Sequence, residues 1–233
     1  MSTDNSKLSA SFKIGLNFLI GIALIIVVLV GIKYAINKQN EMKIAELEKN
    51  ILDMRSAISL DSIRQYSIQK VIQIIDQYNT KMPRHQKYEI AEELFAMTQK
   101  YPNLNIDLLC ATITHESAGT WDPEIVSPAG AMGLMQMMPA TGMFVASYEN
   151  ITWTSAEEIL FNPTYNIRIG SRYLSSLIKL YDVDGGLAAY NGGEARAALW
   201  LGQGKRNGIL AKETQRYVPA IQRLYQEFKA YSM

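Results

Sequence analysis

The most apolar part of the chain lies near its N-terminus. From residue 14 to residue 30 the only interruptions are Asn17 and two glycines, and two further apolar positions extend the run to 19 residues. At about 1.5 Å of rise per residue, a helix of this length nearly spans the hydrocarbon layer of a membrane. The pattern predicts a transmembrane anchor over residues 14–32, preceded by a short cytoplasmic segment over residues 1–13.

A cleaved secretory signal is the main alternative to an anchor. The apolar run is longer than the core of an ordinary signal, and no small-x-small cleavage site follows Gly31. A helix buried in a soluble core fits poorly, because every face of the run is apolar. We therefore interpret the segment as a retained anchor that crosses a membrane once.

Basic residues are unevenly distributed around the predicted span. Lys7 and Lys13 precede it, whereas five basic residues follow it: Lys33, Lys38, Lys43, Lys49 and Arg55. The positive-inside tendency would accordingly place the rest of the chain in the cytoplasm. That tendency is statistical, and the substrate that the motifs below imply overrides it in our interpretation.

A helical stalk is predicted over residues 33–82. Its apolar positions alternate steps of three and four, with charged residues between them: Ile44, Leu47, Ile51, Met54 and Ile58. Two heptads are too few to establish a coiled coil, so packing on itself, on a partner copy, on envelope machinery or on the globular part stays open. A second stripe continues over residues 62–79 until Pro83 breaks the pattern, which places the globular domain at residues 83–233.

The globular part has the punctuation of helices, and no long run alternates with the period of a strand. Ser155 begins a capping box, and Asn162 before a proline predicts the start of a helix that ends at Gly185-Gly186. The last helix carries an apolar face: Val218, Ile221, Leu224, Tyr225 and Phe228. Pro219 is expected near the start of that helix or at a kink. We expect an all-α fold, a compact bundle of about seven short helices.

Composition excludes several classes of function. The formal net charge of +1 gives no electrostatic argument for a nucleic-acid partner. The single cysteine, Cys110, excludes an intramolecular disulfide and a thiolate-rich metal site, and its apolar surroundings indicate a small buried side chain. His85 and His115 are the only histidines. We therefore expect neither a metal nor a cofactor.

One carboxylate stands out in the segment 105–117. Leu109, Ile113 and Glu116 lie at positions i, i+4 and i+7, on one face of a helix that Gly119 ends. An apolar wall and a helix C-terminus both disfavour ionisation, so the pKa of this glutamate should rise. A carboxyl that is still protonated near neutral pH can act as a general acid on a glycosidic bond. The alternative is a glutamate at a frayed helix end that points to water.

The Gly- and Met-rich run at residues 127–141 follows neither a helical nor a strand pattern. Four ordered blocks surround it: Glu116-Ser117, Ser127 with Gly130-Ala131 and Gly133-Leu134-Met135-Gln136, Ala189-Tyr190-Asn191, and Glu213-Thr214 with Tyr217-Val218. In these blocks residues 85–231 resemble the catalytic domain of soluble lytic transglycosylases, in the goose-type lysozyme superfamily. The resemblance implies a compact lysozyme-like helical domain.

The resemblance implies cleavage of peptidoglycan between N-acetylmuramic acid and N-acetylglucosamine. Glu116 would be the single catalytic residue, first an acid and then a base, and the product would carry a 1,6-anhydro ring. The implied substrate-binding residues are Ser117 at the acetamido group, Met135 lining the groove, Gln136, Tyr190 and Asn191 at the saccharide, and Tyr217 beside the site. The domain would lie on the periplasmic or wall side of the inner membrane, anchored through residues 14–32.

Each implied residue also has a plain structural interpretation. Gln136 could be a solvated loop amide, Tyr190 could pack in the core, and Glu213 could orient a neighbour or cap the last helix. His115 lies about 100° around the helix from Glu116, which argues against a catalytic pair. The loop at residues 117–122 is about two residues wider than the commonest form in the family.

Gly192-Gly193-Glu194 also departs from the Ala-Gly-Pro that the family often has after its Tyr-Asn pair. Two other functions stay open at this stage. The domain could be a lysozyme-type hydrolase, or a glycan-binding scaffold of an envelope-spanning secretion or conjugation apparatus. The pattern leaves undetermined the process served, the choice between endo and exo cleavage, and the oligomeric state.

Overall fold

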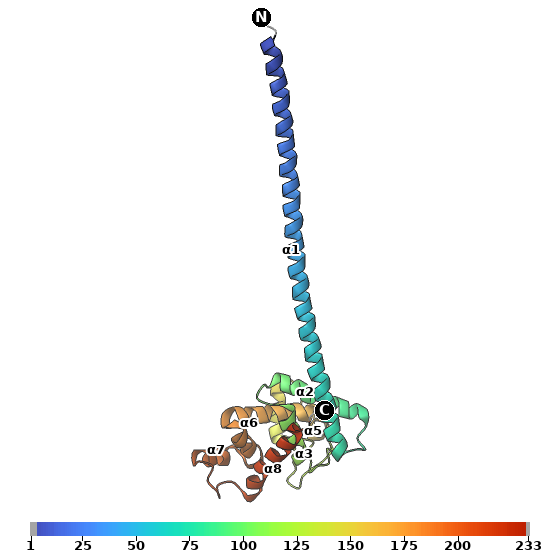
Figure 1. Ribbon diagram of the computed structural model, residues 1–233. Helices are drawn as coiled ribbons and strands as arrows, with labels where there is room; N and C mark the ends of the chain where they lie inside the picture. The colour runs from blue at the N-terminus through green and yellow to red at the C-terminus, as the bar shows by residue number, and fades with distance from the viewer. Residues whose placement is uncertain (1–3, 232–233) are drawn as a thin grey trace. The chain divides into compact units, whose positions relative to one another are not determined.

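The computed structural model describes the backbone of residues 4–231, and the side chains of residue 17 and of residues 19–231. Its helices are α1 Asp4–Tyr78, α2 Arg84–Lys100, α3 Ile106–Glu116, α4 Pro139–Ala146, the 3-10 helix η1 Ser147–Glu149, α5 Ala156–Leu160, α6 Pro163–Gly192, α7 Glu194–Gly202 and α8 Lys212–Lys229 (Figure 1). The strand-type pairings within this range are two isolated bridges, Val126 with Met132 and Met132 with Met137. The predicted all-α fold is confirmed.

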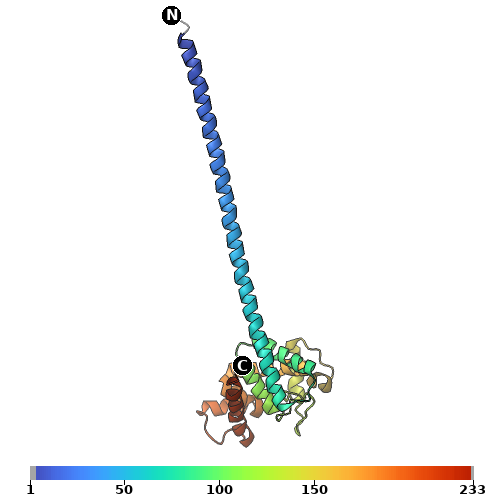
Figure 2. The same cartoon turned by 45° about the vertical axis from the view of Figure 1, so that its right-hand side comes forward.

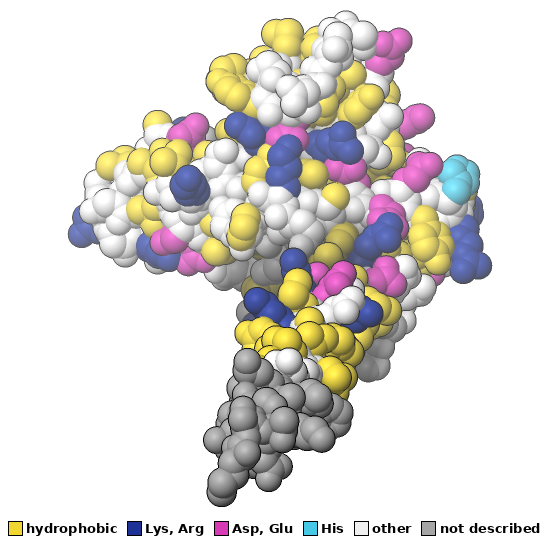
Figure 3. All heavy atoms as spheres, turned by 90° about the horizontal axis from the view of Figure 1, so that it is seen from above, with side chains coloured by type: hydrophobic (Ala, Val, Ile, Leu, Met, Phe, Trp, Pro, Cys, Tyr) yellow, Lys and Arg dark blue, Asp and Glu magenta, His cyan; other side chains and the backbone are white. Residues whose placement is uncertain are grey.

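The chain divides into two compact units, residues 1–61 and residues 62–233. In the first unit the apolar side chains of α1 are exposed, and they appear yellow next to the grey residues in Figure 3. Within the described range this is the one helix long and apolar enough to cross a membrane, a property that a signal sequence near an N-terminus shares. Residues 1–3 of the predicted cytoplasmic segment, and all side chains of residues 1–13, lie outside the described part.

The last turns of α1 belong to the second unit. Ile68, Val71, Ile74 and Ile75 are at most 1% exposed and form part of the main core. The break at Pro83 is therefore the turn between α1 and α2, whereas the sequence placed the start of the globular domain there. The stripe over residues 62–79 was read correctly as helix, but it buries its apolar face in the globular unit rather than continuing the stalk.

The core of the second unit has two parts. The larger contains side chains from the end of α1 and from α2, α3, α6, α7 and α8, and the smaller lies between α4, α5 and α6. Helix α3 packs against α8, and α6 packs against α2, α7 and α8 (Figure 1, and by colour in Figure 2). This arrangement brings the C-terminal end of α3 next to a helix that follows it by about a hundred residues.

Helix α6 does not end at Gly185-Gly186 as predicted. Asn162 caps its start by accepting a hydrogen bond from the amide of Tyr165 at 3.1 Å. The helix is interrupted at Asp182, whose backbone angles are φ 57° and ψ −173°, and whose carboxylate accepts a hydrogen bond from the amide of Gly185 at 3.0 Å. Asp182 thus begins a second helical segment that runs to Gly192.

The two glycines of this segment are needed for close packing. A Cβ at Gly185 would lie 2.5 Å from the side chain of Leu201, and one at Gly186 would lie 2.8 Å from the backbone of Ile178. Both distances are shorter than a carbon–carbon contact allows. The glycine pair therefore marks a close approach of helices, and it was mistaken for a helix end.

Two further expectations concern local structure. Ser155 caps α5 by accepting a hydrogen bond from the amide of Glu158 at 3.1 Å, as predicted. Helix α8 begins at Lys212, so Pro219 lies inside it rather than near its start. Of the face that the sequence assigned to the core, Val218, Ile221 and Phe228 are buried. The other two residues of that face, Leu224 and Tyr225, are partly buried.

The packing of α1 predicts where the second unit can be separated from the first. A chain beginning at Ser62 is expected to fold, whereas a chain beginning at Pro83 loses four fully buried side chains. Each contributes about 1.5–3 kcal/mol, and their sum is comparable with a typical domain stability of about 5–15 kcal/mol. Circular dichroism during heating checks this, and a cooperative thermal transition in the chain from Pro83 would contradict it.

Candidate active site

Helix α3 carries Glu116 as its last residue. Asn105 caps the start of the helix, because its side-chain oxygen accepts a hydrogen bond from the amide of Leu108 at 2.9 Å. Leu109 and Ile113 are fully buried on the face that continues to Glu116. After the helix, Gly119 has φ +72° and its amide donates to the carbonyl of Thr114 at 2.8 Å, which turns the chain away. The carboxylate thus lies at a helix C-terminus, as predicted.

The carboxyl of Glu116 is held by α8. The hydroxyl of Tyr217 donates a hydrogen bond to Glu116 Oε1 at 2.5 Å, and Tyr217 is only 2% exposed. Burial raises the pKa of Glu116 from 4.5 to about 7, against the opposing effect of the Tyr217 hydrogen bond and with a smaller contribution from the negative charge of Glu213. Near neutral pH this partly buried carboxyl therefore exists in both protonation states, so it can donate or accept a proton.

Tyr190 on α6 holds the Gly- and Met-rich loop and is influenced by the charge of Glu116. Its hydroxyl donates a hydrogen bond to the carbonyl oxygen of Met135 at 2.7 Å, and its ring lies 5.4 Å from that of Tyr173. Burial raises the pKa of Tyr190 well above 10.0, and the charge of Glu116 is the next cause. The second effect requires the Tyr190 hydroxyl and the Glu116 carboxyl to be within electrostatic range of each other. The plain core-packing interpretation of Tyr190 is thus incomplete.

The loop itself is fixed by Asn166, which the sequence analysis missed. This fully buried side chain on α6 accepts a hydrogen bond from the amide of Met135 at 2.7 Å. It also donates to the carbonyl oxygens of Met132 and Leu160, both at 2.9 Å. Its only signal in the sequence is a polar residue one turn into a helix, which is equally typical of a solvated position. Tertiary packing decides between the two.

Gly133 is required by the same packing. It has φ +77°, and a Cβ there would lie 2.2 Å from the carbonyl oxygen of Leu160. Its own amide donates a hydrogen bond to the carbonyl of Ile125 at 2.9 Å. Neither the backbone angle nor the space permits a side chain at this position.

Met135 and Ser117 are both fully buried. A Cβ at Gly170 would lie 2.5 Å from the sulfur of Met135, so that side chain packs on α6. Its side chain is 0% exposed, so the part of Met135 that contacts Tyr190 is its carbonyl. The Ser117 hydroxyl accepts a hydrogen bond from the amide of Trp121 at 3.1 Å, which ties down the loop after α3.

Gln136 and Asn191 are partly exposed. The amide nitrogen of Gln136 donates to the carbonyls of Gly133 at 2.9 Å and Ile125 at 3.2 Å, which leaves the amide oxygen outside these two bonds. The side-chain oxygen of Asn191 accepts a hydrogen bond from the hydroxyl of Thr214 at 2.7 Å, which leaves its amide protons outside that bond. Gln136 is therefore an ordered part of the loop rather than a freely solvated amide.

The two departures from the family pattern have distinct structural consequences. In the widened loop, Trp121 is fully buried, and its indole nitrogen donates to the hydroxyl of Thr114 at 3.0 Å. Trp121 therefore ties the widened loop to α3, while Ala118, Thr120 and Asp122 of the same loop are exposed. Glu194 is exposed and accepts a hydrogen bond from the hydroxyl of Tyr181 at 3.1 Å.

His115 packs its ring edge-on against Tyr217, with centroids 4.8 Å apart. Burial lowers its pKa from 6.5, which favours the neutral imidazole, while the charge of Glu213 acts in the opposite direction. Among the side chains that the structure describes, no group of three or more His, Cys, Asp or Glu residues is placed to hold a metal ion. His115 thus supports the aromatic ring that holds Glu116.

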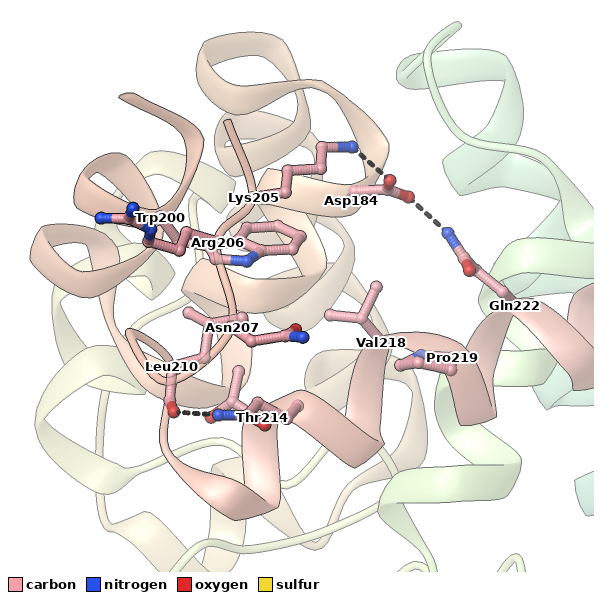
Figure 4. Close-up of a pocket in the computed structure, with 11 residues that line it drawn as sticks. Asp184, Trp200, Lys205, Arg206, Asn207, Leu210, Thr214, Val218, Pro219 and Gln222 are labelled. Carbon is pink, nitrogen blue, oxygen red and sulfur yellow. Dashed lines mark hydrogen bonds and ion pairs between the residues drawn. The ribbon is translucent and has the colours of Figure 1, made fainter. Parts of the chain in front are cut away.

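A pocket of about 270 Å³ lies among the second segment of α6, α7, the loop after α7, and α8 (Figure 4). Lys205 and Gln222 both point to the carboxylate of Asp184, with Lys205 at 2.5 Å. Glu116 does not line this pocket, although Thr214, the partner of Asn191, does. The pocket is therefore distinct from the site around the acid.

Residues 93–211 match the model of the family described as "Transglycosylase SLT domain". The soluble lytic murein transglycosylase of Escherichia coli (strain K12) is 38% identical over 94 residues, which are 40% of this chain and 14% of that protein. The endo-type membrane-bound lytic murein transglycosylase A of Klebsiella pneumoniae subsp. pneumoniae is 42% identical over 73 residues, which are 30% of this chain and 34% of that protein. The chain therefore spans only about a seventh to a third of these relatives.

Two solved structures resemble the fold. An inactive glutamate-to-glutamine mutant of the lytic transglycosylase Slt from Pseudomonas aeruginosa has a TM-score of 0.51 and 26% identity, over 58% of this chain and 23% of that one. A complex of the 70-kDa soluble lytic transglycosylase with bulgecin A has a TM-score of 0.50 and 27% identity, over 63% of this chain and 26% of that one. Because the family match extends over half of the chain and contains Glu116, the glycine- and methionine-rich loop and Tyr190, the chain belongs to the SLT transglycosylase domain family.

Proposed function

We propose that this protein is a membrane-anchored peptidoglycan lytic transglycosylase. It cleaves the glycan bond between N-acetylmuramic acid and N-acetylglucosamine and leaves a 1,6-anhydro ring. The observation that carries the proposal is the carboxyl of Glu116, held by Tyr217 at the end of α3 with a pKa of about 7, inside the residues that match the family. The related structure described as an inactive glutamate-to-glutamine mutant supports a glutamate as the essential group.

In the first step, protonated Glu116 donates its proton to the glycosidic oxygen. The bond from that oxygen to C1 of the muramic acid sugar breaks, and N-acetylglucosamine leaves with a new hydroxyl. Burial keeps the proton on the carboxyl until the substrate accepts it, because ionisation is disfavoured at a desolvated site. The acetamido group of the same sugar stabilises the positive charge at C1.

In the second step, ionised Glu116 accepts the proton of the C6 hydroxyl, and the C6 oxygen bonds to C1. The ring closes, no water is consumed, and the glutamate is again protonated. One carboxyl that exchanges a proton in both directions near neutral pH suits this sequence. The hydrogen bond from Tyr217 stabilises the ionised form that the second step needs. Substrate-assisted enzymes of this kind are exceptions to the paired-carboxylate rule of glycosidases.

The supporting residues divide into two groups by exposure. Gln136, Tyr190 and Asn191 are partly exposed, and we assign the saccharide contacts to them. Met135 and Ser117 are buried, so we assign them to positioning the loops rather than to contact with sugar. The Met135 carbonyl acts through Tyr190, and the Ser117 hydroxyl acts through the amide of Trp121.

Glu116→Gln is expected to abolish the formation of anhydro-muramic acid ends, because an amide cannot donate the required proton. The measurement is mass spectrometry of sacculi digested by the full chain in detergent. Glu157→Gln, which changes an exposed carboxylate on α5, is the matched control and should leave the products unchanged. Reducing-end products that take up labelled water oxygen would indicate a lysozyme-type hydrolase instead.

A folding control accompanies Glu116→Gln. Because the folded-state pKa of Glu116 lies above 4.5, ionising it costs stability, and the cost grows as pH rises from 4.5 to about 7. The glutamine variant should therefore gain melting temperature relative to the wild type at pH 8 and lose that advantage at pH 4.5. A variant that is uniformly less stable would make its inactivity uninformative. Retained wall function in cells with Glu116→Gln would favour the glycan-binding scaffold.

Tyr217→Phe is expected to move the alkaline limb of the kcat/KM profile to higher pH. The wild-type limb should lie near pH 7, where Glu116 loses the proton it must donate. Removing the hydroxyl removes the hydrogen bond that stabilises the carboxylate, so the pKa of Glu116 rises further. Tyr148→Phe, at an exposed tyrosine on η1, is the control. A limb that stays in place or moves to lower pH contradicts this role for Tyr217.

The location proposed for the enzyme is the outer face of the inner membrane, with α1 as a retained anchor. The apolar N-terminal helix supports this, as does the similarity to a relative described as membrane-bound. Peptidoglycan lies outside the cytoplasm, so we let the substrate override the positive-inside tendency.

Protease added to spheroplasts should degrade the second unit. Without protease, the whole chain should stay in the membrane fraction. Protection of the second unit from protease would overturn the location. A soluble chain shortened by about thirty residues would overturn the retained anchor.

A further inference from the structure

We propose that the exposed stripe of α1 formed by Ile44, Leu47, Ile51, Met54 and Ile58 pairs with the same stripe of a second copy, as a parallel two-stranded coiled coil. We call these five residues the heptad stripe. The inference concerns the first unit of the chain and goes beyond the proposed activity, which belongs to the second. It rests on exposure, on the identity of the residues in the heptad, and on charge.

All five side chains of the heptad stripe are exposed by half or more, between 50% and 64%. They lie on one face of a helix that runs unbroken from Asp4 to Tyr78. Apolar side chains in a row at a mean spacing of 3.5 residues keep facing a partner helix when the two helices supercoil. Burying such a row recovers free energy that a solitary helix in water leaves unused.

The residue types in the heptad favour two parallel strands. With Ile44 at position a, the isoleucines Ile51 and Ile58 also fall at a, and Leu47 and Met54 fall at d. Parallel dimers typically have β-branched residues such as isoleucine at position a, and residues without a branch at Cβ, such as leucine, at position d. One heptad earlier, Asn37 falls at a, where a paired asparagine specifies two strands and fixes the register.

Charges at the flanking positions agree with this register. Lys43 occupies position g and Glu48 occupies the next position e, so in a parallel dimer Lys43 of each copy faces Glu48 of the other. The following pair at the same positions is Asn50 with Arg55, which brings no like charges together. Two symmetry-related ion pairs therefore reinforce the same alignment that the apolar residues select.

The short length of the heptad stripe is compensated if both copies are anchored in one membrane. Confinement raises the effective concentration of one stalk near another, so a contact too weak to form in dilute solution can form there. Anchors at the same end of both helices also impose the parallel orientation. The effect of confinement is the one part of the inference that rests on the proposed anchor. It explains how a stripe of about two heptads can be long enough for two copies to pair.

Single-cysteine variants provide a direct test. Cys110 is fully buried, so a cysteine placed on the stalk would be the accessible thiol of the chain. Leu47 at position d and Leu52 at position b are both exposed leucines, at 60% and 62%. In membranes treated with a mild oxidant, Leu47→Cys should give a product of twice the 26.2 kDa chain mass. Leu52→Cys, the matched control, should give at least fivefold less, because its side chain points away from the partner.

A charge exchange tests the register independently. Lys43→Glu places two glutamates opposite each other in both symmetry-related pairs, and it should reduce cross-linking through Leu47→Cys by about threefold to tenfold. Adding Glu48→Lys restores opposite charges and should restore cross-linking. The loss should shrink in high salt, since exposed charges are screened.

The outcomes separate this inference from the proposed activity. Equal cross-linking at residues 47 and 52, or none at either, would overturn the coiled coil, as would a product whose mass indicates a different protein. Failure of the double charge exchange to restore cross-linking would overturn the register. Cleavage of sacculi is measured on the same samples and should be unchanged, because the changed residues lie outside the second unit. Loss of cleavage in every sample, the unmodified chain included, would instead concern the proposed function.

Discussion

The hydrogen bond from the Tyr217 hydroxyl to the carboxyl of Glu116 joins the end of α3 to α8, and the chemistry of the site depends on it. Burial drives the carboxyl toward its neutral form, whereas this bond stabilises the ionised form, and the balance gives a pKa of about 7. A group poised in this way can both give and take a proton near neutral pH. The edge-on contact of His115 with the Tyr217 ring holds the donor in place.

Buried polar side chains hold the glycine- and methionine-rich loop in place near this bond. The Asn166 side chain accepts one hydrogen bond and donates two, all to or from backbone groups, and two of these groups belong to the glycine- and methionine-rich loop. Tyr190 then links that loop to the neighbourhood of Glu116. A buried polar group without such partners would lower the stability of the fold by about 1–3 kcal/mol. The position of the loop therefore depends on the packing of α6 beside it.

The two units obey different physical constraints. The second buries its apolar residues within itself, including the last turns of α1. The first exposes its apolar side chains throughout the described range. The partners that we propose for it are a membrane and a second copy of the same helix. The family match concerns only the second unit, because residues 93–211 begin well after the division at Ser62.

Patterns within a few residues predicted those features of the structure that depend on near neighbours in the chain. The caps at Asn162 and Ser155 and the position of Glu116 at a helix end depend on neighbours within four residues, and all three are found as expected. The apolar face of α3 also predicted the raised pKa of Glu116, because periodicity alone shows that the carboxyl continues a buried stripe.

Contacts between distant segments decided the rest. Gly185 and Gly186 resembled a helix end but serve close helix packing, Met135 resembled a groove residue but is buried, and residues 62–78 resembled a stalk but complete the core. Gly185 meets Leu201 on α7, and Gly186 meets Ile178 across the interruption of α6 at Asp182. Met135 packs on α6, and residues 62–78 pack in the core of the second unit. No pattern within a few residues contains these contacts. The sequence by itself thus determined the all-α class, the caps of two helices and the position of Glu116 at a helix end. Tertiary packing determined which side chains meet that carboxyl, because burial and hydrogen bonding depend on neighbours that only the fold brings together.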